Sequence, residues 1–298
     1  MKIILGIIHR KGSGKTSWWK GLACLLWLGF AVQVQATVLF NDTFSDGERL
    51  TQNQPNSLQW YTAGPSSSVS VSSATGLTFL DTTGGHAAAM AYFTPADLDL
   101  GASLTLSFTY SFQQIANGDN NFMFGLYDSG GLRLTSDNSG LNSAIFNKYT
   151  GYAASGVFGN DPSGPGRDHI EVRNKVGNNL RSIATYSEGL QHLQSGAATP
   201  GETYMASLQI SRTSGGIVVE STVGSTAITQ IYADGAFTRF DTVGIFGADT
   251  GLFMVDNIKL DYVGTPEPSP FWALMLVGGM VGFKSFRIRV MPEFRKRV

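Results

Sequence analysis

The sequence is poor in cysteine, and its residues 37–264 are also poor in tryptophan and in the hydrophobic periodicity of helices. Its single cysteine, Cys24, cannot build a disulfide framework. Between residues 37 and 264 apolar residues do not recur with the period of a helix, which excludes a helical bundle over that range. Trp60 is the only tryptophan in the same range. Because it lies in an apparent strand, we expect it to pack in a core and not to offer a sugar platform.

Charge is distributed unevenly along the chain. Of the 21 Lys and Arg residues, five lie in residues 1–36 and six in residues 265–298, which leaves ten for residues 37–264. That middle region holds 20 of the 22 Asp and Glu residues, since only Glu267 and Glu293 lie outside it. A surplus of about ten negative charges argues against nucleic acid and anionic lipid as partners of the middle region.

The N-terminal segment has the three parts of a secretory signal peptide. Its first part is positive, with Lys2, Arg10, Lys11, Lys15 and Lys20. Residues 21–34 form an apolar stretch, and Val34-Gln35-Ala36 supplies a small-residue cleavage site. We therefore expect residues 1–36 to be a signal peptide that is cut after Ala36, and the protein to be exported.

The C-terminal segment, residues 265–298, has three successive parts. Pro266, Glu267 and Pro268 begin a proline-rich stretch, an apolar run covers residues 271–283, and the end is basic. Alternate prolines fix extended, exposed backbone. The apolar run of about 13 residues would span roughly 20 Å as a helix, against about 30 Å of bilayer hydrocarbon. It suits transient holding in a membrane better than permanent anchoring, although a simple tail anchor is the alternative.

These three parts resemble the PEP-CTERM sorting signal of bacterial envelope proteins. The resemblance covers only this tail. It implies that an exosortase, a membrane processing enzyme coupled to exopolysaccharide export, recognises Pro266, Glu267 and Pro268. The expected course is a precursor held in the inner membrane by the C-terminal segment, followed by release to the cell surface or the extracellular space.

The middle region, residues 37–264, is predicted to form one β domain. In residues 103–112, Leu, Phe and Tyr alternate strictly with Ser and Thr, so one face of this strand is expected on a core and the other in water. Residues 121–127 are expected to be its antiparallel neighbour. Further predicted strands are residues 58–62, 69–72, 87–93, 170–173, 181–186, 203–212, 217–223, 242–246 and 253–263. Their regular spacing predicts an all-β antiparallel sandwich.

The two ends of this domain carry apolar strand patterns, in residues 40–44, 240–245 and 255–260. Their order resembles that of concanavalin-like or jelly-roll carbohydrate-binding sandwiches. The resemblance implies that the first and last strands pair and that the protein binds a polysaccharide. Candidate sugar contacts are the loop residues Asp119, Asn120, Asn121, Tyr149 and Tyr152.

Two other classes of function compete with carbohydrate binding. His169, Glu171 and Arg173 share one face of a predicted strand, and a polysaccharide lyase could use such a set. An exposed ion pair explains the same residues. A hydrolase is disfavoured, since no array of paired acids is present. The third reading is a purely structural matrix protein.

Asp256 interrupts an apolar phase of the last predicted strand, which contains Met254, Ile258 and Leu260. A carboxylate facing a core requires a partner or a cation. One expectation is a structural Ca²⁺ bound by Asp256 together with Asp42 or Asp46, where the terminal strands meet. The other is that Asp256 accepts hydrogen bonds at a bulge.

Overall fold

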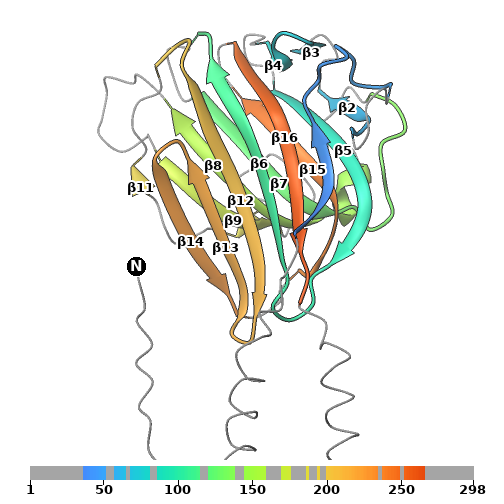
Figure 1. The fold of residues 1–298 in the computed structure, drawn as a ribbon, viewed down its shortest axis with the longest axis vertical. Coiled ribbons are helices and arrows are strands. Elements are labelled where there is room, and N and C mark those ends of the chain that lie inside the picture. The colour runs from blue at the N-terminus through green and yellow to red at the C-terminus, as the bar shows by residue number, and fades with distance from the viewer. Residues whose placement is uncertain are drawn as a thin grey trace, which may run out of the picture. The chain divides into compact units, whose positions relative to one another are not determined.

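In the computed structural model of the chain, two antiparallel β-sheets pack face to face (Figure 1). This confirms the predicted all-β sandwich. The structure describes residues 36–51, 57–64, 68–80, 86–114, 120–137, 144–158, 169–175, 186–187, 193–194, 199–233, 237–248 and 252–265. These residues belong to one compact unit, Val34–Thr265. None of the helical segments in these ranges is long and apolar enough to cross a membrane.

The first sheet, sheet A, lies in front in Figure 1. Its strands run in the order β14-β13-β12-β6-β16-β4-β3, and β1 also pairs with β16. Their bounds are β1 Ala36–Asp42, β3 Val69–Ser72, β4 Gly76–Phe79, β6 Ser103–Phe112, β12 Thr203–Thr213, β13 Gly216–Val223, β14 Thr226–Tyr232 and β16 Phe253–Val263.

The second sheet, sheet B, lies behind. Its strands run in the order β10-β9-β8-β7-β15-β5-β2, and β11 also pairs with β9. Their bounds are β2 Trp60–Ala63, β5 His86–Asp97, β7 Asn120–Asp128, β8 Thr150–Phe158, β9 His169–Lys175, β10 Tyr186–Ser187, β11 Leu193–Gln194 and β15 Arg239–Ala248. A short 3-10 helix, η2 (Ala144–Lys148), precedes β8.

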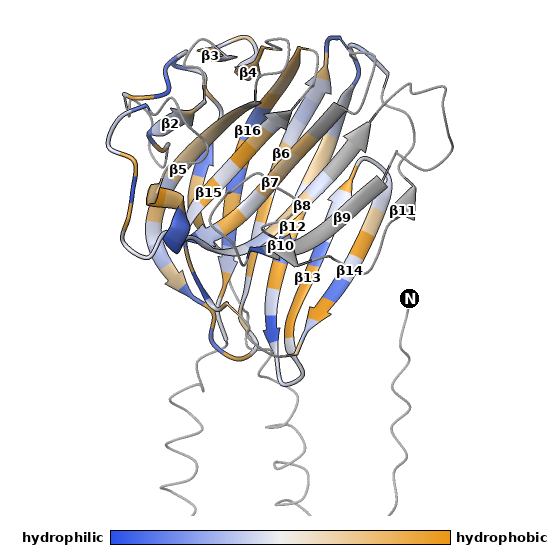
Figure 2. Cartoon of the chain, turned by 180° about the vertical axis from the view of Figure 1, so that it is seen from behind, coloured by the Kyte–Doolittle hydropathy of each residue, from blue (hydrophilic) through white to orange (hydrophobic). Residues whose placement is uncertain are grey.

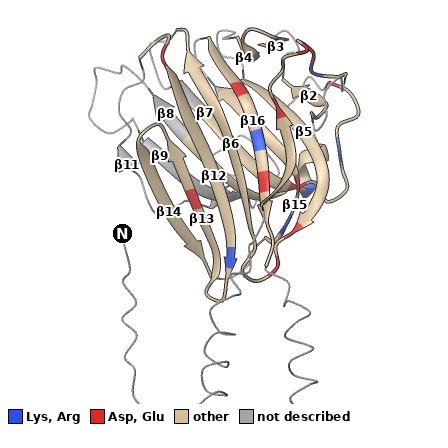
Figure 3. Ribbon diagram, in the orientation of Figure 1, with Lys and Arg blue, Asp and Glu red and all other residues tan. Residues whose placement is uncertain are grey.

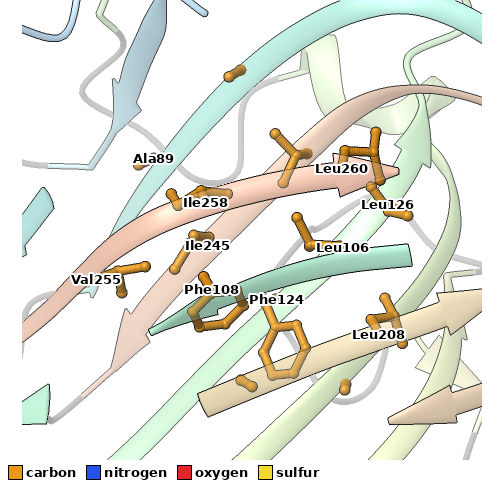
Figure 4. Packing of buried hydrophobic residues seen from close by; sticks show 14 of the residues in the cluster. Ala89, Leu106, Phe108, Phe124, Leu126, Leu208, Ile245, Val255, Ile258 and Leu260 are labelled. Atoms are coloured by element: carbon orange, nitrogen blue, oxygen red, sulfur yellow. The ribbon is translucent and has the colours of Figure 1, made fainter. Parts of the chain in front are cut away.

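The core lies between the sheets and follows the alternation of β6. Leu104, Leu106 and Phe108 are buried, while the Ser and Thr residues between them are partly exposed. Phe108 meets Phe124 of β7 edge to face across the interior, with ring centroids 4.9 Å apart (Figure 4). Trp60 is fully buried in this core, which confirms the prediction for that residue.

The predicted pairing of residues 121–127 with residues 103–112 is wrong. These strands, β7 and β6, lie in different sheets: β6 pairs with β12 and β16, whereas β7 pairs with β8 and β15. The chain crosses from one sheet to the other between them. Both strands face the common core, so the apolar pattern fits either arrangement.

The predicted pairing of the first and last strands is confirmed. β1 pairs antiparallel with β16, with Ala36 opposite Val263 and Asp42 opposite Ile258. Most predicted strands also occur close to their expected bounds. The sequence analysis missed β4 and β11, which are short, β8, which is rich in small residues, and β14. Of the predicted strand at residues 181–186, only Tyr186 lies within the described residues.

A β-bulge in β16 corrects the expected orientation of Asp256. The register against β6 shifts between Asp256 and Lys259, and Asn257 has a φ of 53°. The extra residue exchanges the two faces of the strand. Val255 points to the core before the bulge and Ile258 after it. Asp256 therefore lies on the outer side, not on the apolar side.

Candidate functional site

The outer side of sheet A carries two rows of polar side chains across five adjacent strands. The first row contains Asp261, Thr105, Gln209, Glu220 and Thr229, which are successive register partners on β16, β6, β12, β13 and β14. The second contains Lys259, Ser107, Ser207, Thr222 and Ala227 on the same strands. We call these the polar rows. At about 4.8 Å between strands, each row extends over about 19 Å.

The polar rows are open to solvent and carry few charges. All ten side chains are partly or fully exposed. Figure 3 shows charged residues along β16 on this side and otherwise mainly uncharged residues. Lys259 Nζ lies 2.8 Å from Asp261 Oδ2, which joins the two rows at β16. Met205 of β12, 65% exposed, adds an apolar contact on the same side.

The chemistry of the polar rows suits a ligand with many hydroxyl groups. Ser and Thr hydroxyls both donate and accept hydrogen bonds, the Gln209 amide does the same, and the Glu220 carboxylate accepts them. A sugar polymer presents donors and acceptors of these kinds along its whole length. The row arrangement can therefore make repeated contacts with such a polymer.

The outer side of sheet B is covered over β2, β5, β15, β7 and β8. A second apolar cluster lies there, formed by buried residues of the sheet and of the segment that precedes β8: Ala63, Ala88, Met90, Met123, Tyr127, Leu134, Phe146, Tyr149, Ala153 and Phe246. We call residues 129–137 together with 144–149 the strap. Figure 2 views sheet B from outside, with η2 of the strap beside the sheet. The strap thus gives sheet B an apolar layer on both sides.

Two glycines of sheet B make room for this outer layer. A Cβ atom on Gly125 would lie 2.4 Å from the Tyr127 hydroxyl, and one on Gly244 would lie 2.9 Å from Met90 Sδ. The larger side chains therefore lie across the glycine positions. This packing uses the space in which a ligand would otherwise contact the sheet.

A buried carboxylate ties the strap to sheet B. Asp241, 4% exposed, accepts hydrogen bonds from Ser129 N at 2.8 Å, Ser129 Oγ at 2.7 Å and Arg133 Nη2 at 2.8 Å. Thr242 Oγ1 donates a further bond at 2.7 Å. Burial by itself raises the pKa of Asp241, but the hydrogen bonds from Arg133, Ser129 and Thr242 outweigh it and hold the pKa below its usual value.

Arg133 extends this network over sheet B. Its guanidinium donates to the Phe93 oxygen at 3.1 Å and lies 5.4 Å from the centroid of the Tyr92 ring. The hydroxyls of Tyr92 and Tyr149 are 2.9 Å apart, and Leu134 N donates to Tyr92 Oη at 2.8 Å. The sequence analysis did not identify this network. The sequence held one indication of it. Asp241 lies in the otherwise apolar run of residues 240–246, and a buried carboxylate needs hydrogen-bond partners.

Asp137 fixes the end of the strap's first segment, residues 129–137. Arg49 forms a two-pronged ion pair with it, including a 2.8 Å bond from Nη1 to Oδ1, and Thr62 N donates to the same oxygen at 2.9 Å. The hydrogen bonds from Arg49 lower the pKa of Asp137. These partners are far apart in the sequence, so no local pattern could reveal them.

Two predicted sugar contacts are wrong because their rings are buried. Tyr149 is a buried residue of the strap that faces sheet B, and its hydroxyl bonds to Tyr92. Tyr152 lies in the main core beside Tyr232, and its hydroxyl accepts a 3.0 Å bond from Phe237 N. Burial raises the pKa of Tyr152 to about 12. Both tyrosines stabilise the fold and present no surface to a ligand.

The other predicted sugar contacts lie largely outside the described residues. Asn120 and Asn121 begin β7, but the structure describes only their backbone, and Asp119 falls in an undescribed range. The side chains of His169, Glu171 and Arg173 in β9 are likewise undescribed. Pro266, Glu267 and Pro268 follow the last described residue, Thr265.

The predicted calcium site is wrong in its ligand set. Asp42 is buried on the core side of β1 and accepts bonds from Trp60 Nε1 at 2.8 Å and Phe44 N at 3.0 Å. Asp256 lies on the outer side of sheet A, where its carboxylate accepts bonds from Asn257 N and Nδ2. Asp46 accepts a bond from Glu48 N.

The alternative expectation for Asp256, hydrogen bonding at a bulge, is confirmed. Burial raises the pKa of Asp42, despite its hydrogen bonds from Trp60, Phe44 and Leu58. In the part of the chain that the structure describes, no three His, Cys, Asp or Glu residues form a group able to hold a metal ion.

Comparisons with known proteins find likeness in architecture alone. No family model and no curated protein sequence matches the chain. The basic winged bean lectin, solved with Tn-antigen, is 13% identical, covers 78% of this chain and 100% of its own, and gives a TM-score of 0.49. The carbohydrate recognition domain of Emp47p is 13% identical, covers 77% of this chain and 97% of its own, and gives a TM-score of 0.48. A seed lectin of Lotus tetragonolobus is 16% identical, covers 78% of this chain and 99% of its own, and gives 0.46.

Proposed function

We propose that this protein is an exported β-sandwich that binds a neutral polysaccharide through the polar rows of sheet A. The observation that carries the proposal is the row from Asp261 to Thr229, in which polar side chains align on five adjacent strands. Each polar contact contributes only about 0.5–1.5 kcal/mol net. Many contacts are therefore needed at once, and a polymer with repeating hydroxyl groups supplies them.

The charge of the domain favours a neutral polymer over an acidic one. Acidic residues outnumber Lys and Arg by two to one in residues 37–264. Within the polar rows, Asp261 and Glu220 face a single cation, Lys259. A polyuronate would meet net repulsion at this surface, whereas a neutral glucan would not.

Binding without catalysis is the activity proposed. In the polar rows the Asp261 carboxylate is paired with Lys259, and the hydroxyls of Thr105 and Ser107 have no histidine beside them in the row. Nucleophilic hydroxyls in enzymes need an adjacent general base. The lyase alternative rests on the β9 residues and is separated by the assay below, because a lyase would release product from polyuronates.

The proposal is tested by affinity electrophoresis of the full-length protein in gels containing a soluble neutral glucan or alginate. We expect the glucan to retard the wild-type protein and alginate to leave its migration unchanged. Thr105→Val combined with Gln209→Leu should abolish at least nine-tenths of the retardation. Thr135→Val, a matched change at an exposed position on the strap, should retain it. Free migration of the wild type in every neutral polymer would refute the proposal, and product release from alginate would favour the lyase.

We also propose that the sorting signal acts on the folded domain. Ala36, the expected end of the signal peptide, is paired with Val263, three residues before Pro266. Both processing points therefore adjoin the same end of the β1–β16 pair. Mass spectrometry of protein secreted by a host with an exosortase should find no peptides from residues 271–298, and Glu267→Ala should slow their removal. Intact C-terminal peptides in secreted material would contradict this.

A further inference from the structure

The polar rows form a band that crosses the strands of sheet A, and apolar side chains border it on both sides. On the same five strands, the row next to the Asp261 row consists of Val263, Ser103, Ser211, Val218 and Ile231. Three of these five residues are apolar, and Ile231 is 59% exposed. On the other side of the band, Met205 of β12 is 65% exposed. The polar band therefore has a direction, and this direction is perpendicular to the strands.

A polar run along a single strand is the alternative path for a long ligand, and β6 offers one. Its five outward residues are Ser or Thr, but Ser111 is only 7% exposed, and Thr109 Oγ1 donates to the Asp256 oxygen at 3.1 Å. The other three, Ser103, Thr105 and Ser107, cover about 14 Å along the strand, whereas each polar row covers about 19 Å. A long ligand thus meets more polar groups across the strands than along β6.

The spacing of the polar rows matches the shape of one class of sugar polymer. Neighbouring strands are about 4.8 Å apart, and the two rows are about 6.8 Å apart because they lie two residues apart on each strand. A pyranose ring linked through equatorial bonds at opposite ends of the ring advances an extended chain by about one strand spacing. Such a ribbon carries hydroxyl groups on both edges, so that one edge can lie over each row. An axial link instead winds the chain into a helix, which does not stay aligned with straight rows.

The Lys259–Asp261 ion pair marks one end of the band. It joins the two rows at β16, where Lys259 Nζ lies 2.8 Å from Asp261 Oδ2. The next residue in the Asp261 row, Val38 of β1, is apolar and 41% exposed. At the other end, the second row finishes with Ala227 of β14. The band therefore has room for about five sugar units, one for each strand from β16 to β14.

We infer that the polar rows bind a neutral polymer of β-1,4-linked pyranoses as an extended ribbon that lies across the strands, with one sugar unit on each strand. This inference rests on the proposed carbohydrate binding and names its substrate class. The two hydroxyl edges of the ribbon contact the two rows. Thr222 of β13 is then a contact for a sugar unit two strands away from the one at Ser107 of β6. The site rejects helical α-1,4-linked and β-1,3-linked glucans by their shape.

The substrate class is tested by isothermal titration calorimetry of the full-length protein with cello-oligosaccharides of three, five and six units. Maltopentaose and laminaripentaose serve as oligomers of the same length and different shape. Affinity should rise at least about tenfold from three to five cello-oligosaccharide units, because each added unit adds hydrogen bonds, and by less than about twofold from five to six. Maltopentaose and laminaripentaose should each bind at least about fivefold more weakly than cellopentaose.

Two matched double variants test the direction of the ribbon. Ser207→Ala with Thr222→Val removes two hydroxyls from the second polar row, and Ser103→Ala with Ser211→Ala removes two from the bordering row. All four side chains are partly exposed. The first pair should weaken cellopentaose binding at least about fivefold, and the second should change it by less than about twofold. Circular dichroism checks that each variant is folded, and Gln209→Leu in the Asp261 row replaces the first pair should that variant unfold.

The outcomes separate this inference from the proposed function. Equal affinity for the three pentaoses, no gain in affinity beyond three units, or equal effects of the two double variants would each overturn the inference and leave carbohydrate binding in place. Retardation by a neutral polymer without binding of any oligosaccharide would also overturn the inference alone. Free migration in every neutral polymer, together with no binding in the calorimeter, would overturn both.

Discussion

The outer sides of the two sheets differ in what covers them. On sheet A, short hydroxyl side chains such as Thr105 and Ser107 face solvent. On sheet B, Met90, Tyr127 and Phe246 occupy the equivalent outward positions and lie beneath the strap. Sheet B is thus a middle layer with apolar packing on both sides, and sheet A is a surface layer. The open side is the one available to a large ligand.

The amino-acid patterns of the strands differ in the same way. In β6 every second residue is Ser or Thr, as expected for a strand with one wet face. In β5 and β7 the apolar residues are almost continuous, as in Ala87 to Phe93 and Phe122 to Tyr127. A strand that is apolar on both faces needs a cover on both faces. The pattern therefore indicates where a covering segment is required.

The largest effect that would test this comparison is expected from Phe146→Ala in the strap. Phe146 is fully buried and packs edge to face on Tyr149 at 5.4 Å. Truncating a buried Phe costs about 3–5 kcal/mol of unfolding free energy. Urea denaturation should show this loss, whereas Met205→Ala on the open side should change stability by less than about 0.5 kcal/mol. Similar small losses for both variants would mean that the strap is not part of the stable core.

A smaller effect is expected from Asp241→Asn, which removes the charge that holds the strap. Hydrogen bonds to a charged group contribute about 1.5–3 kcal/mol, so we expect a loss of about 2–3 kcal/mol in urea denaturation at neutral pH. The exposed ion pair of Arg239 and Asp97 provides the control. Asp97→Asn should cost at most about 1 kcal/mol.

Acidic pH should reduce the difference in unfolding free energy between the wild type and the Asp241→Asn variant. The folded-state pKa of Asp241 is lowered, so its stabilisation is complete above the unfolded value of about 3.9 and is lost as pH falls through the lower folded value. Below about pH 4 the unfolding free energies of the wild type and the Asp241→Asn variant should therefore converge. The raised pKa of Asp42 acts in the opposite sense in both proteins and does not affect the comparison. A constant difference down to pH 2 would contradict the role assigned to the Asp241 charge.

Local patterns predicted much of the fold and little of the candidate site. Strict alternation predicted β6 and β12 almost to the residue. It could not predict their neighbours, because every core-facing strand carries the same pattern whichever sheet it joins. The solvent face of β6 was expected, but its alignment with Gln209, Glu220 and Asp261 depends on register between distant segments. The aromatic sugar contacts failed because a turn-like sequence does not reveal that Tyr149 is covered.

The sequence by itself determined the class of fold, the absence of a disulfide framework and the acidic charge of the domain. These follow from composition and from a period of two residues, which are properties of the chain alone. Only the tertiary structure decided which face stays open, where Asp256 points and which partners hold Asp241 and Asp137. One bulge residue reverses the faces of β16, and the bond from Arg49 to Asp137 spans 88 residues. Such contacts form only when the core brings distant segments together, so no local pattern contains them.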